Sequence, residues 1–214
     1  MRIAFLDLDH TLLAADSNQL WMSFLCSHDM VSAQDLSIHD QFMIDYANGT
    51  LDFGALSRFR CRIEADLPSE FLFSQRTLFE REILFPALAP RAIQLLADLR
   101  DMGLSLVLVS ATGRSLVDPV AHCLGIDHVI CPCFGPDKVD HVQAWLLDRC
   151  CSLESLQESW FFTDSHNDLP LLERVANPVV VDPDPSLKRV AMDRGWRAIS
   201  LCNVDCEGPF NLHG

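Results

Sequence analysis

The spacing of apolar residues along the chain changes at about residue 84. Between residues 17 and 82, apolar side chains recur every three or four positions, a spacing typical of amphipathic helices. Four consecutive helices are predicted there, over 17–25, 32–46, 52–65 and 68–81, and Ser17 is the predicted N-cap of the first. No strand pattern interrupts them. This stretch is therefore expected to be a small all-helical insertion.

Short apolar runs alternate with amphipathic segments in the rest of the chain. The runs predict strands over 2–6, 104–109, 129–130, 159–163, 179–181 and 198–201. The segments between them predict helices over 90–102, 114–124, 138–150, 169–175 and 186–194. Such alternation is typical of an α/β fold, a doubly wound parallel sheet with helices on both faces. We expect residues 1–15 and 84–214 to form this core and residues 16–83 the helical insertion.

Polar side chains follow the predicted strands. In a doubly wound sheet, ligands bind beyond the carboxyl ends of the strands, so side chains at those ends are expected to gather. The segments after three strands, together with the start of the helix at 138, supply Asp7, Asp9, Thr11, Ser110, Lys138, Asp164 and Asp168. Acids, hydroxyls and one ammonium are thus expected at one edge of the sheet.

This set of side chains suits phosphoryl transfer with a hard cation. Converging carboxylates are costly without a counterion, and Mg²⁺ is typically held by one or two of them. Asp7 and Asp164 suit that role. A carboxylate can also act as a nucleophile, and a second acid two residues later can protonate a leaving alcohol. A serine hydroxyl and a lysine ammonium can hold the remaining phosphoryl oxygens.

The segments Asp7-Leu8-Asp9-His10-Thr11 and Asp164-x3-Asp168, with Ser110 and Lys138 between them, occur in the order of the four motifs of the haloacid dehalogenase superfamily. The sequence resembles its phosphoserine-phosphatase-like branch, subfamily IB, above all from Asp164 to Leu172. The resemblance covers nearly the whole chain. It implies a HAD-like (Rossmannoid) core and a helical cap inserted between the first two motifs.

The resemblance also implies roles. Asp7 would be the nucleophile and Asp9 the general acid/base, while Asp168 would orient a metal-bound water or Lys138. The implied catalytic residues are Asp7, Asp9, Ser110 and Lys138, and the implied Mg²⁺ ligands are Asp7, Asp9, Asp164 and Asp168. The implied substrate-binding residues are Thr11, Ser110, Lys138, Arg58 and Arg62.

Two features leave alternatives open. Arg58 and Arg62 lie one turn apart on the third predicted helix, where they could bind a substrate carboxylate or phosphate, or form a solvated face. The segment from Ile130 to Lys138 is too short for the hairpin that relatives usually carry there. We expect that hairpin to be absent.

The charge balance narrows the range of partners. The 214 residues carry 16 basic and 30 acidic side chains, a net charge of −14, which argues against nucleic-acid and anionic-membrane partners. Asp7 and Asp9 interrupt any apolar signal sequence at the N-terminus, so a cytoplasmic location is expected. The nine cysteines are expected to be free thiols, with a structural zinc site as the alternative.

Lysine is rare in this chain. Fourteen of the 16 basic residues are arginines, and the two lysines are Lys138 and Lys188. A lysine kept at position 138 is expected where a compact point charge is needed.

The expected function is a Mg²⁺-dependent phosphatase that acts through an aspartyl-phosphate. Its substrate would be a small phosphorylated metabolite, either phosphoserine-like or another amino-alcohol phosphate, and the chain would be a monomer or homodimer. The alternatives are a histidinol-phosphate phosphatase, a phosphotransferase, or a non-catalytic protein that binds a phosphorylated metabolite.

Overall fold

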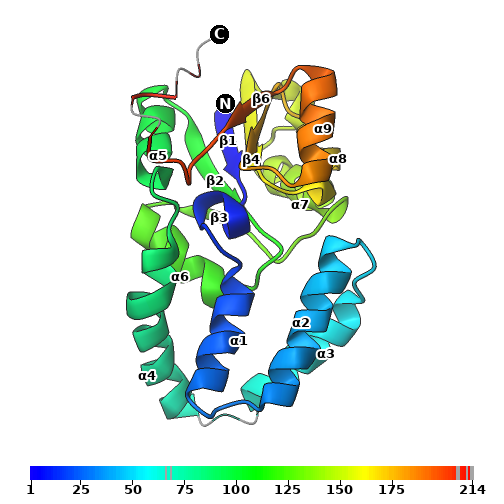
Figure 1. The fold of residues 1–214 in the computed structure, drawn as a ribbon. Helices are drawn as coiled ribbons and strands as arrows, with labels where there is room; N and C mark the ends of the chain where they lie inside the picture. Colours follow the sequence, from blue (N-terminus) through cyan, green and yellow to red (C-terminus); the bar gives the residue numbers. More distant parts are fainter. Residues whose placement is uncertain (66, 68, 206–207, 211, 213–214) are drawn as a thin grey trace. The chain divides into compact units, whose positions relative to one another are not determined.

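The computed structural model describes residues 1–65, 67, 69–205, 208–210 and 212. The chain divides into two compact units. The first is formed by Met1–Ala14 and Leu88–Gly214, and the second by Ala15–Ala87. Figure 1 shows the strands and helices of both units.

A six-stranded sheet forms the centre of the first unit, and every pair of neighbouring strands is parallel. The strand order is β3-β2-β1-β4-β5-β6. The strands are β1 (Arg2–Leu6), β2 (Ser105–Val109), β3 (His128–Ile130), β4 (Glu158–Thr163), β5 (Asn177–Val181) and β6 (Arg197–Ile199). The predicted α/β class with a parallel sheet is confirmed.

In the described residues of this unit, five α-helices accompany the sheet (Figure 1). They are α5 (Ala92–Asp101), α6 (Arg114–Leu124), α7 (Asp137–Leu147), α8 (Leu169–Leu172) and α9 (Pro185–Arg194). Gly125 and Gly195 end α6 and α9 in the left-handed conformation, which glycine adopts without strain. Helix α8 ends earlier than its predicted limit at residue 175, so the apolar spacing overestimated its length.

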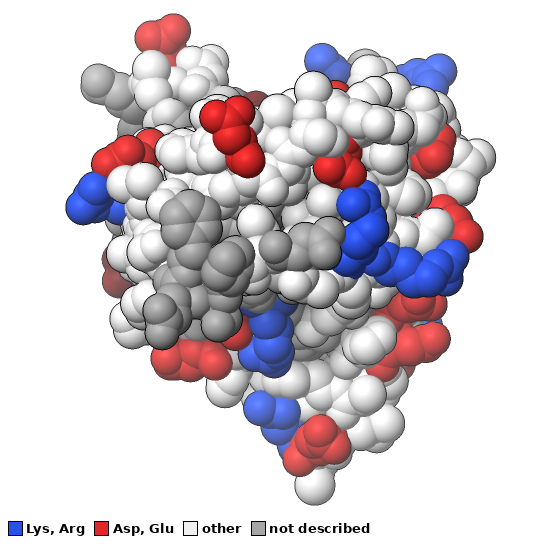
Figure 2. All heavy atoms as spheres, turned by 90° about the horizontal axis from the view of Figure 1, so that it is seen from below, with Lys and Arg blue, Asp and Glu red and all other residues white. Residues whose placement is uncertain are grey.

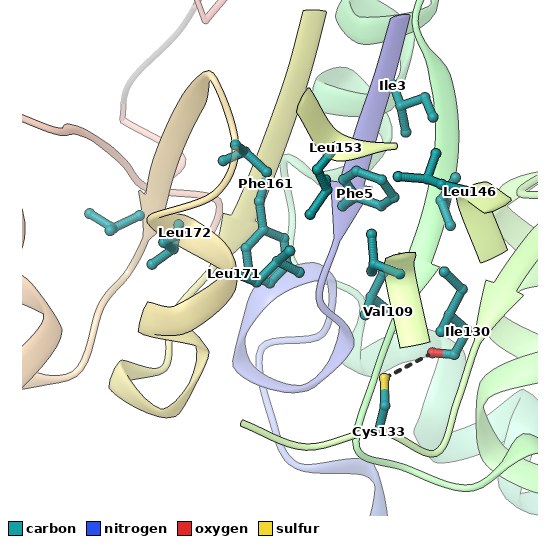
Figure 3. Packing of buried hydrophobic residues seen from close by; sticks show 14 of the residues in the cluster. Ile3, Phe5, Val109, Ile130, Cys133, Leu146, Leu153, Phe161, Leu171 and Leu172 are labelled. Carbon is teal, nitrogen blue, oxygen red and sulfur yellow. Dashed lines mark hydrogen bonds between the residues drawn. The ribbon is translucent and has the colours of Figure 1, made fainter. Parts of the chain in front are cut away.

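The central strands are buried on both faces, as their continuous apolar runs predict. Figure 3 shows one face, where Phe5 and Phe161 pack in a cluster with Leu146 of α7 and Leu171 of α8. Leu6 and Leu108 point the other way and are also fully buried. Both faces of the sheet are therefore covered, so polar side chains of the central strands gather at the strand ends.

The second unit is helical in its described residues. It contains α1 (Ser17–Ser27), α2 (Ala33–Ala47), α3 (Phe53–Ala65) and α4 (Ser69–Phe79), followed by turns over Glu80–Ala87. All four predicted helices are confirmed. Asp16, one residue before the expected Ser17, caps α1 by accepting from the backbone N–H of Gln19, and Ser32 caps α2 through a capping box. Trp21, Phe24 and Phe79 form the aromatic core of the second unit, with ring centroids 5.0–5.6 Å apart.

The connection from β3 to α7 is a short turn. Residues 131–136, all described, contain no strand, so the expected absence of a hairpin is confirmed. This turn is bonded to the end of β2: the backbone N–H of Ser110 donates to the carbonyl of Ile130 at 3.1 Å, and that of Cys133 donates to the carbonyl of Ser110 at 2.9 Å. The thiol of Cys133 also points at the carbonyl of Ile130 (Figure 3). The turn thereby fixes the backbone of Ser110.

Three findings concern the expectations for the cysteines, for membrane spans and for charge. The eight cysteines in the described residues are free thiols, and Cys206 lies outside those residues. Among the described helices, none is long and apolar enough to cross a membrane. Figure 2 shows acidic and basic side chains interspersed on one face, so the net negative charge does not form a single acidic field there.

The buried aromatic side chains of the sheet provide a test of this core. Phe161→Ala should lower the free energy of unfolding by about 3–5 kcal/mol, because it removes a fully buried ring and leaves a cavity. Met192→Ala on α9, where the side chain is 74% exposed, should change it by less than about 0.5 kcal/mol. Urea denaturation measures both, and equal effects would contradict the assigned packing.

Candidate active site

Asp7 lies where the strand order of the sheet reverses. Strand β1 pairs with β2 on one side and with β4 on the other, and the backbone N–H of Asp7 extends the second pairing by donating to the carbonyl of Phe162 at 2.9 Å. The connections that follow β1 and β4 lead to opposite sides of the sheet, to β2 and β5, so Asp7 lies at the kind of switch point where doubly wound folds bind ligands. The sequence places its first acid there because the apolar run of β1 ends at Leu6.

A tight turn over Leu8–Leu12 follows Asp7. The backbone of Asp9 is extended (φ −68°, ψ 134°), and the next residue, His10, has left-handed angles (φ 56°, ψ 5°). Histidine is one of the residues that occur there more often than most non-glycine residues. The backbone N–H of Leu13 then donates to the carbonyl of Leu8 at 2.9 Å and closes the turn. Leu8, Thr11 and Leu12 are buried, whereas His10 is exposed.

Lys138 bridges two of the carboxylates. Its Nζ donates to Asp7 Oδ1 and to Asp168 Oδ2, each at 2.7 Å, and the residue is only 1% exposed. Thr163, at the end of β4, donates its hydroxyl to the same Asp168 oxygen at 2.7 Å. Because Lys138 lies in the first turn of α7, its ammonium joins three elements of the fold: β1, α7 and the segment after β4.

Thr11 holds the other acid of the set. Its hydroxyl accepts from the backbone N–H of Asp164 at 3.1 Å and is 3.2 Å from Asp164 Oδ1, to which it donates. Thr11 therefore joins the turn after β1 to the segment after β4. Its expected contact with substrate stays a prediction.

Thr112, to which the sequence analysis assigned no role, connects Ser110 to Asp9. The hydroxyl oxygen of Ser110 accepts from the backbone N–H of Thr112 at 3.1 Å. The hydroxyl of Thr112 donates to Asp9 Oδ2 at 2.7 Å. Both Ser110 and Thr112 are 1% exposed. The end of β2 is therefore bonded directly to the turn after β1.

The site contains more acidic than basic side chains, and burial together with the neighbouring acids raises the pKa values of two carboxyl groups. Burial raises the pKa of Asp7 to about 7, although Lys138 lowers it and Asp168 and Asp9 raise it further. Burial also raises the pKa of Asp164 to about 8, and the charges of Asp7 and Asp168 add to that rise. Among the described residues, Lys138 is the one buried lysine or arginine. One ammonium does not balance these acids, so a second cation fits the site.

Mg²⁺ fits this donor set. The side chains of Asp7 and Asp164 and the backbone carbonyl of Asp9 are the groups that would hold it, with water and phosphate oxygens completing the shell. The described residues contain no cluster of three or more His, Cys, Asp or Glu side chains arranged to hold a metal. Asp168 accepts hydrogen bonds from Lys138 and Thr163, and its role in orienting Lys138 or a metal-bound water stays a prediction.

The two arginines expected at the substrate belong to the helical unit. Arg62 donates to Asp35 Oδ1 at 2.7 Å, and its guanidinium lies 5.2 Å from the centre of the Phe59 ring. The guanidinium of Arg58 lies beside Gly54. A Cβ atom added to Gly54 would be 3.2 Å from Arg58 Nη1. Substrate binding by Arg58 and Arg62 stays a prediction.

Three further side chains organise the site: Thr112, Thr163 and Asp184. Asp184 accepts from the backbone N–H of His166 at 2.6 Å and, as the N-cap of α9, from those of Ser186 and Leu187. The expectation that polar side chains gather at the carboxyl ends of strands indicates the positions of Thr112 and Thr163, because both lie where a strand ends. It does not indicate which carboxylate each hydroxyl contacts.

Comparisons with known proteins show the family and the fold of this chain. The sequence profile of the haloacid dehalogenase-like hydrolase family matches residues 4–173. A histidinol-phosphatase from Neisseria meningitidis is 30% identical over 218 residues, which cover 93% of this chain and 98% of that protein. A probable phosphatase from Mycobacterium tuberculosis is 25% identical over 92% of this chain and 75% of its own length.

Two solved structures share the fold. A protein of unknown function from Bordetella pertussis has a TM-score of 0.84 and 30% identity, covering 94% of this chain and 98% of its own. A substrate-bound phosphoserine phosphatase has a TM-score of 0.60 and 13% identity, covering 95% of this chain and 94% of its own. At 13% identity, that second likeness shows the fold alone.

The raised pKa values predict how Mg²⁺ affects stability. Because the folded-state pKa values of Asp7 and Asp164 exceed the ordinary value of 3.8, the metal-free fold binds more protons than the unfolded chain and loses stability as pH rises from about 4 to 8. Mg²⁺ binds the ionised forms, so its gain in melting temperature should be larger at pH 8 than at pH 5.5.

Differential scanning fluorimetry measures that gain. Asp164→Asn should remove most of it, because the variant lacks one of the two carboxylates assigned to the metal. A gain that is equal at both pH values, or that survives in Asp164→Asn, would contradict the metal assignment.

The two lysines provide a matched pair of variants. Lys138→Arg should lower the free energy of unfolding by about 1–3 kcal/mol, because a guanidinium overfills a site that is only 1% exposed. Lys188→Arg, at an exposed position on α9, should change it by less than about 0.5 kcal/mol. Chemical denaturation measures both variants. Wild-type stability in Lys138→Arg would show that the site does not require a compact ammonium.

Proposed function

Because this chain belongs to the haloacid dehalogenase-like hydrolase family and is a phosphatase, we propose that it hydrolyses an amino-alcohol phosphate through an aspartyl-phosphate on Asp7. The observation that supports the chemistry is the buried ammonium of Lys138, which holds Asp7 at the switch point of the sheet. Histidinol phosphate is the first candidate substrate, because the histidinol-phosphatase is 30% identical along nearly its full length. Phosphoserine is the second.

The reaction has two steps. In the first, the carboxylate of Asp7 attacks phosphorus, the bond from phosphorus to the alcohol oxygen breaks, and Asp9 gives its proton to that oxygen. In the second, Asp9 takes a proton from water as the water oxygen attacks phosphorus. The bond between phosphorus and Asp7 then breaks, phosphate leaves, and Asp9 is again protonated.

Ser110 and Lys138 hold the phosphoryl group in this proposal. The ammonium of Lys138 lowers the pKa of Asp7 against the effect of burial and so favours the ionised nucleophile. The same ammonium and the Ser110 hydroxyl are assigned to the non-bridging oxygens of the phosphoryl group. Mg²⁺, when bound, would neutralise charge on the phosphoryl oxygens.

The helical unit Ala15–Ala87 is proposed as a cap that excludes bulk water during turnover. Arg58 and Arg62 are its proposed substrate-binding residues. A guanidinium can bind phosphate or carboxylate through two parallel hydrogen bonds. Arg62 donates one hydrogen bond to Asp35 and is half-exposed, so substrate binding by this residue would replace an internal ion pair.

A panel of phosphate esters tests the proposed substrate class. With Mg²⁺ present, kcat/KM should be highest for histidinol phosphate or phosphoserine and lower for sugar phosphates. Activity should be lost in EDTA and restored by Mg²⁺. An added acceptor such as glycerol separates hydrolysis from phosphotransfer, because transfer would yield a new ester. A preference for sugar phosphates would contradict the substrate class, and an active chelated enzyme would contradict the metal.

Asp7→Asn tests the nucleophile. The variant should lower kcat about 10³-fold or more while leaving the circular dichroism spectrum unchanged, because an amide cannot form the covalent intermediate. Turnover within about tenfold of wild type would remove Asp7 as the nucleophile.

A further inference from the structure

The hydroxyl of Thr112 donates to Asp9 Oδ2 across 103 residues of sequence, at 2.7 Å. Thr112 follows β2, whereas Asp9 lies in the turn after β1. The side chain is 1% exposed, so little bulk water competes for the contact. The carboxyl group of Asp9 is therefore held by a donor that belongs to a different strand connection.

From this contact we propose that Thr112 is a positioning residue that orients Asp9 for its proton transfers. The inference rests on the proposed function, in which Asp9 gives a proton to the leaving alcohol and later takes one from water. It assigns to Thr112 neither contact with substrate nor contact with the reacting phosphorus.

The chemistry of the carboxyl group shows why such a donor matters. A hydroxyl that donates to Oδ2 fixes the rotation of the carboxyl group, because a hydrogen bond weakens steeply when its angle departs from linear. Proton transfer requires a heavy-atom distance of about 2.6–3.2 Å, so a group that turns freely spends less time in the productive geometry.

Thr112 also connects Asp9 to Ser110. Its backbone N–H donates to the Ser110 hydroxyl oxygen at 3.1 Å, two residues away. The same residue therefore orients the hydroxyl assigned to the phosphoryl group and the acid assigned to the leaving oxygen. This second contact uses the backbone, so it survives any substitution of the Thr112 side chain other than proline.

Packing alone does not require a hydroxyl at position 112. Valine has nearly the shape of threonine and is well suited to a buried site. What valine lacks is the donor to Asp9, and its absence leaves a carboxylate oxygen with one hydrogen bond fewer. Thr112→Val therefore removes the proposed interaction while conserving volume, and Thr112→Ser keeps the donor while removing a methyl group.

The dependence on the leaving group tests the proposal. An alkoxide needs a proton as it leaves, whereas p-nitrophenolate leaves as a stable anion. Thr112→Val should lower kcat/KM about 10–100-fold for the alkyl phosphate that wild type hydrolyses best, and less than about threefold for p-nitrophenyl phosphate. Thr112→Ser should stay within about threefold of wild type for both substrates. Thr112→Ala is a second hydroxyl-free variant if the valine protein does not fold.

Two further variants separate the possible failures. Ser159→Ala removes another buried hydroxyl, which accepts from the backbone N–H of Ala176 near the opposite end of β4, and should show no dependence on the leaving group. Asp9→Asn should show a stronger dependence than Thr112→Val.

If Asp9→Asn discriminates between the two esters and the hydroxyl-free variants of Thr112 do not, the positioning role is wrong and the proposed function stands. If Asp9→Asn affects both esters equally, the acid/base role of Asp9 fails, and the inference fails with it. A loss in Thr112→Ser as large as that in Thr112→Val would also overturn the inference.

Discussion

The buried ammonium of Lys138 is the interaction on which the rest of the site depends. Removing a charge from water costs several kcal/mol, and the cost is offset only when its partners are close and well oriented. Asp7 and Asp168 meet that condition at 2.7 Å each. Because these acids come from the end of β1 and the segment after β4, the ion pairs connect the first turn of α7 to the ends of two neighbouring strands. The scarcity of lysine in this chain agrees with a need for a compact charge at this position.

Threonine hydroxyls complete this arrangement. Thr11, Thr112 and Thr163 contact Asp164, Asp9 and Asp168 respectively, at 2.7–3.2 Å. A β-branched side chain has restricted rotation about χ1, so each hydroxyl is a stiff donor rather than a mobile one. Burial and mutual repulsion disfavour the ionised form of these acids. The hydroxyls nevertheless hold the carboxyl groups in fixed positions. The site remains net negative, a condition that suits a divalent cation and costs stability in its absence.

Much of the fold follows from local pattern. The apolar runs predicted all six strands because both faces of a doubly wound sheet are buried, and helical spacing predicted the helices of both units. Smaller features escaped prediction where local signals compete. Asp16 rather than Ser17 caps α1, because either side chain can accept from the first turn. Helix α8 ends at Leu172, before the Val175 that spacing would include.

By itself the sequence determined which side chains stand at the carboxyl edge of the sheet, because that depends only on where each strand ends. It thereby predicted that the acids, the hydroxyls and the Lys138 ammonium gather at that edge. Only the tertiary structure decided the partners. Thr112 contacts Asp9 across 103 residues, and Lys138 contacts Asp7 across 131, because strand order and register bring those backbones together. Hydrogen bonds act over about 3 Å, and no pattern within one strand specifies the atoms that the neighbouring strand presents.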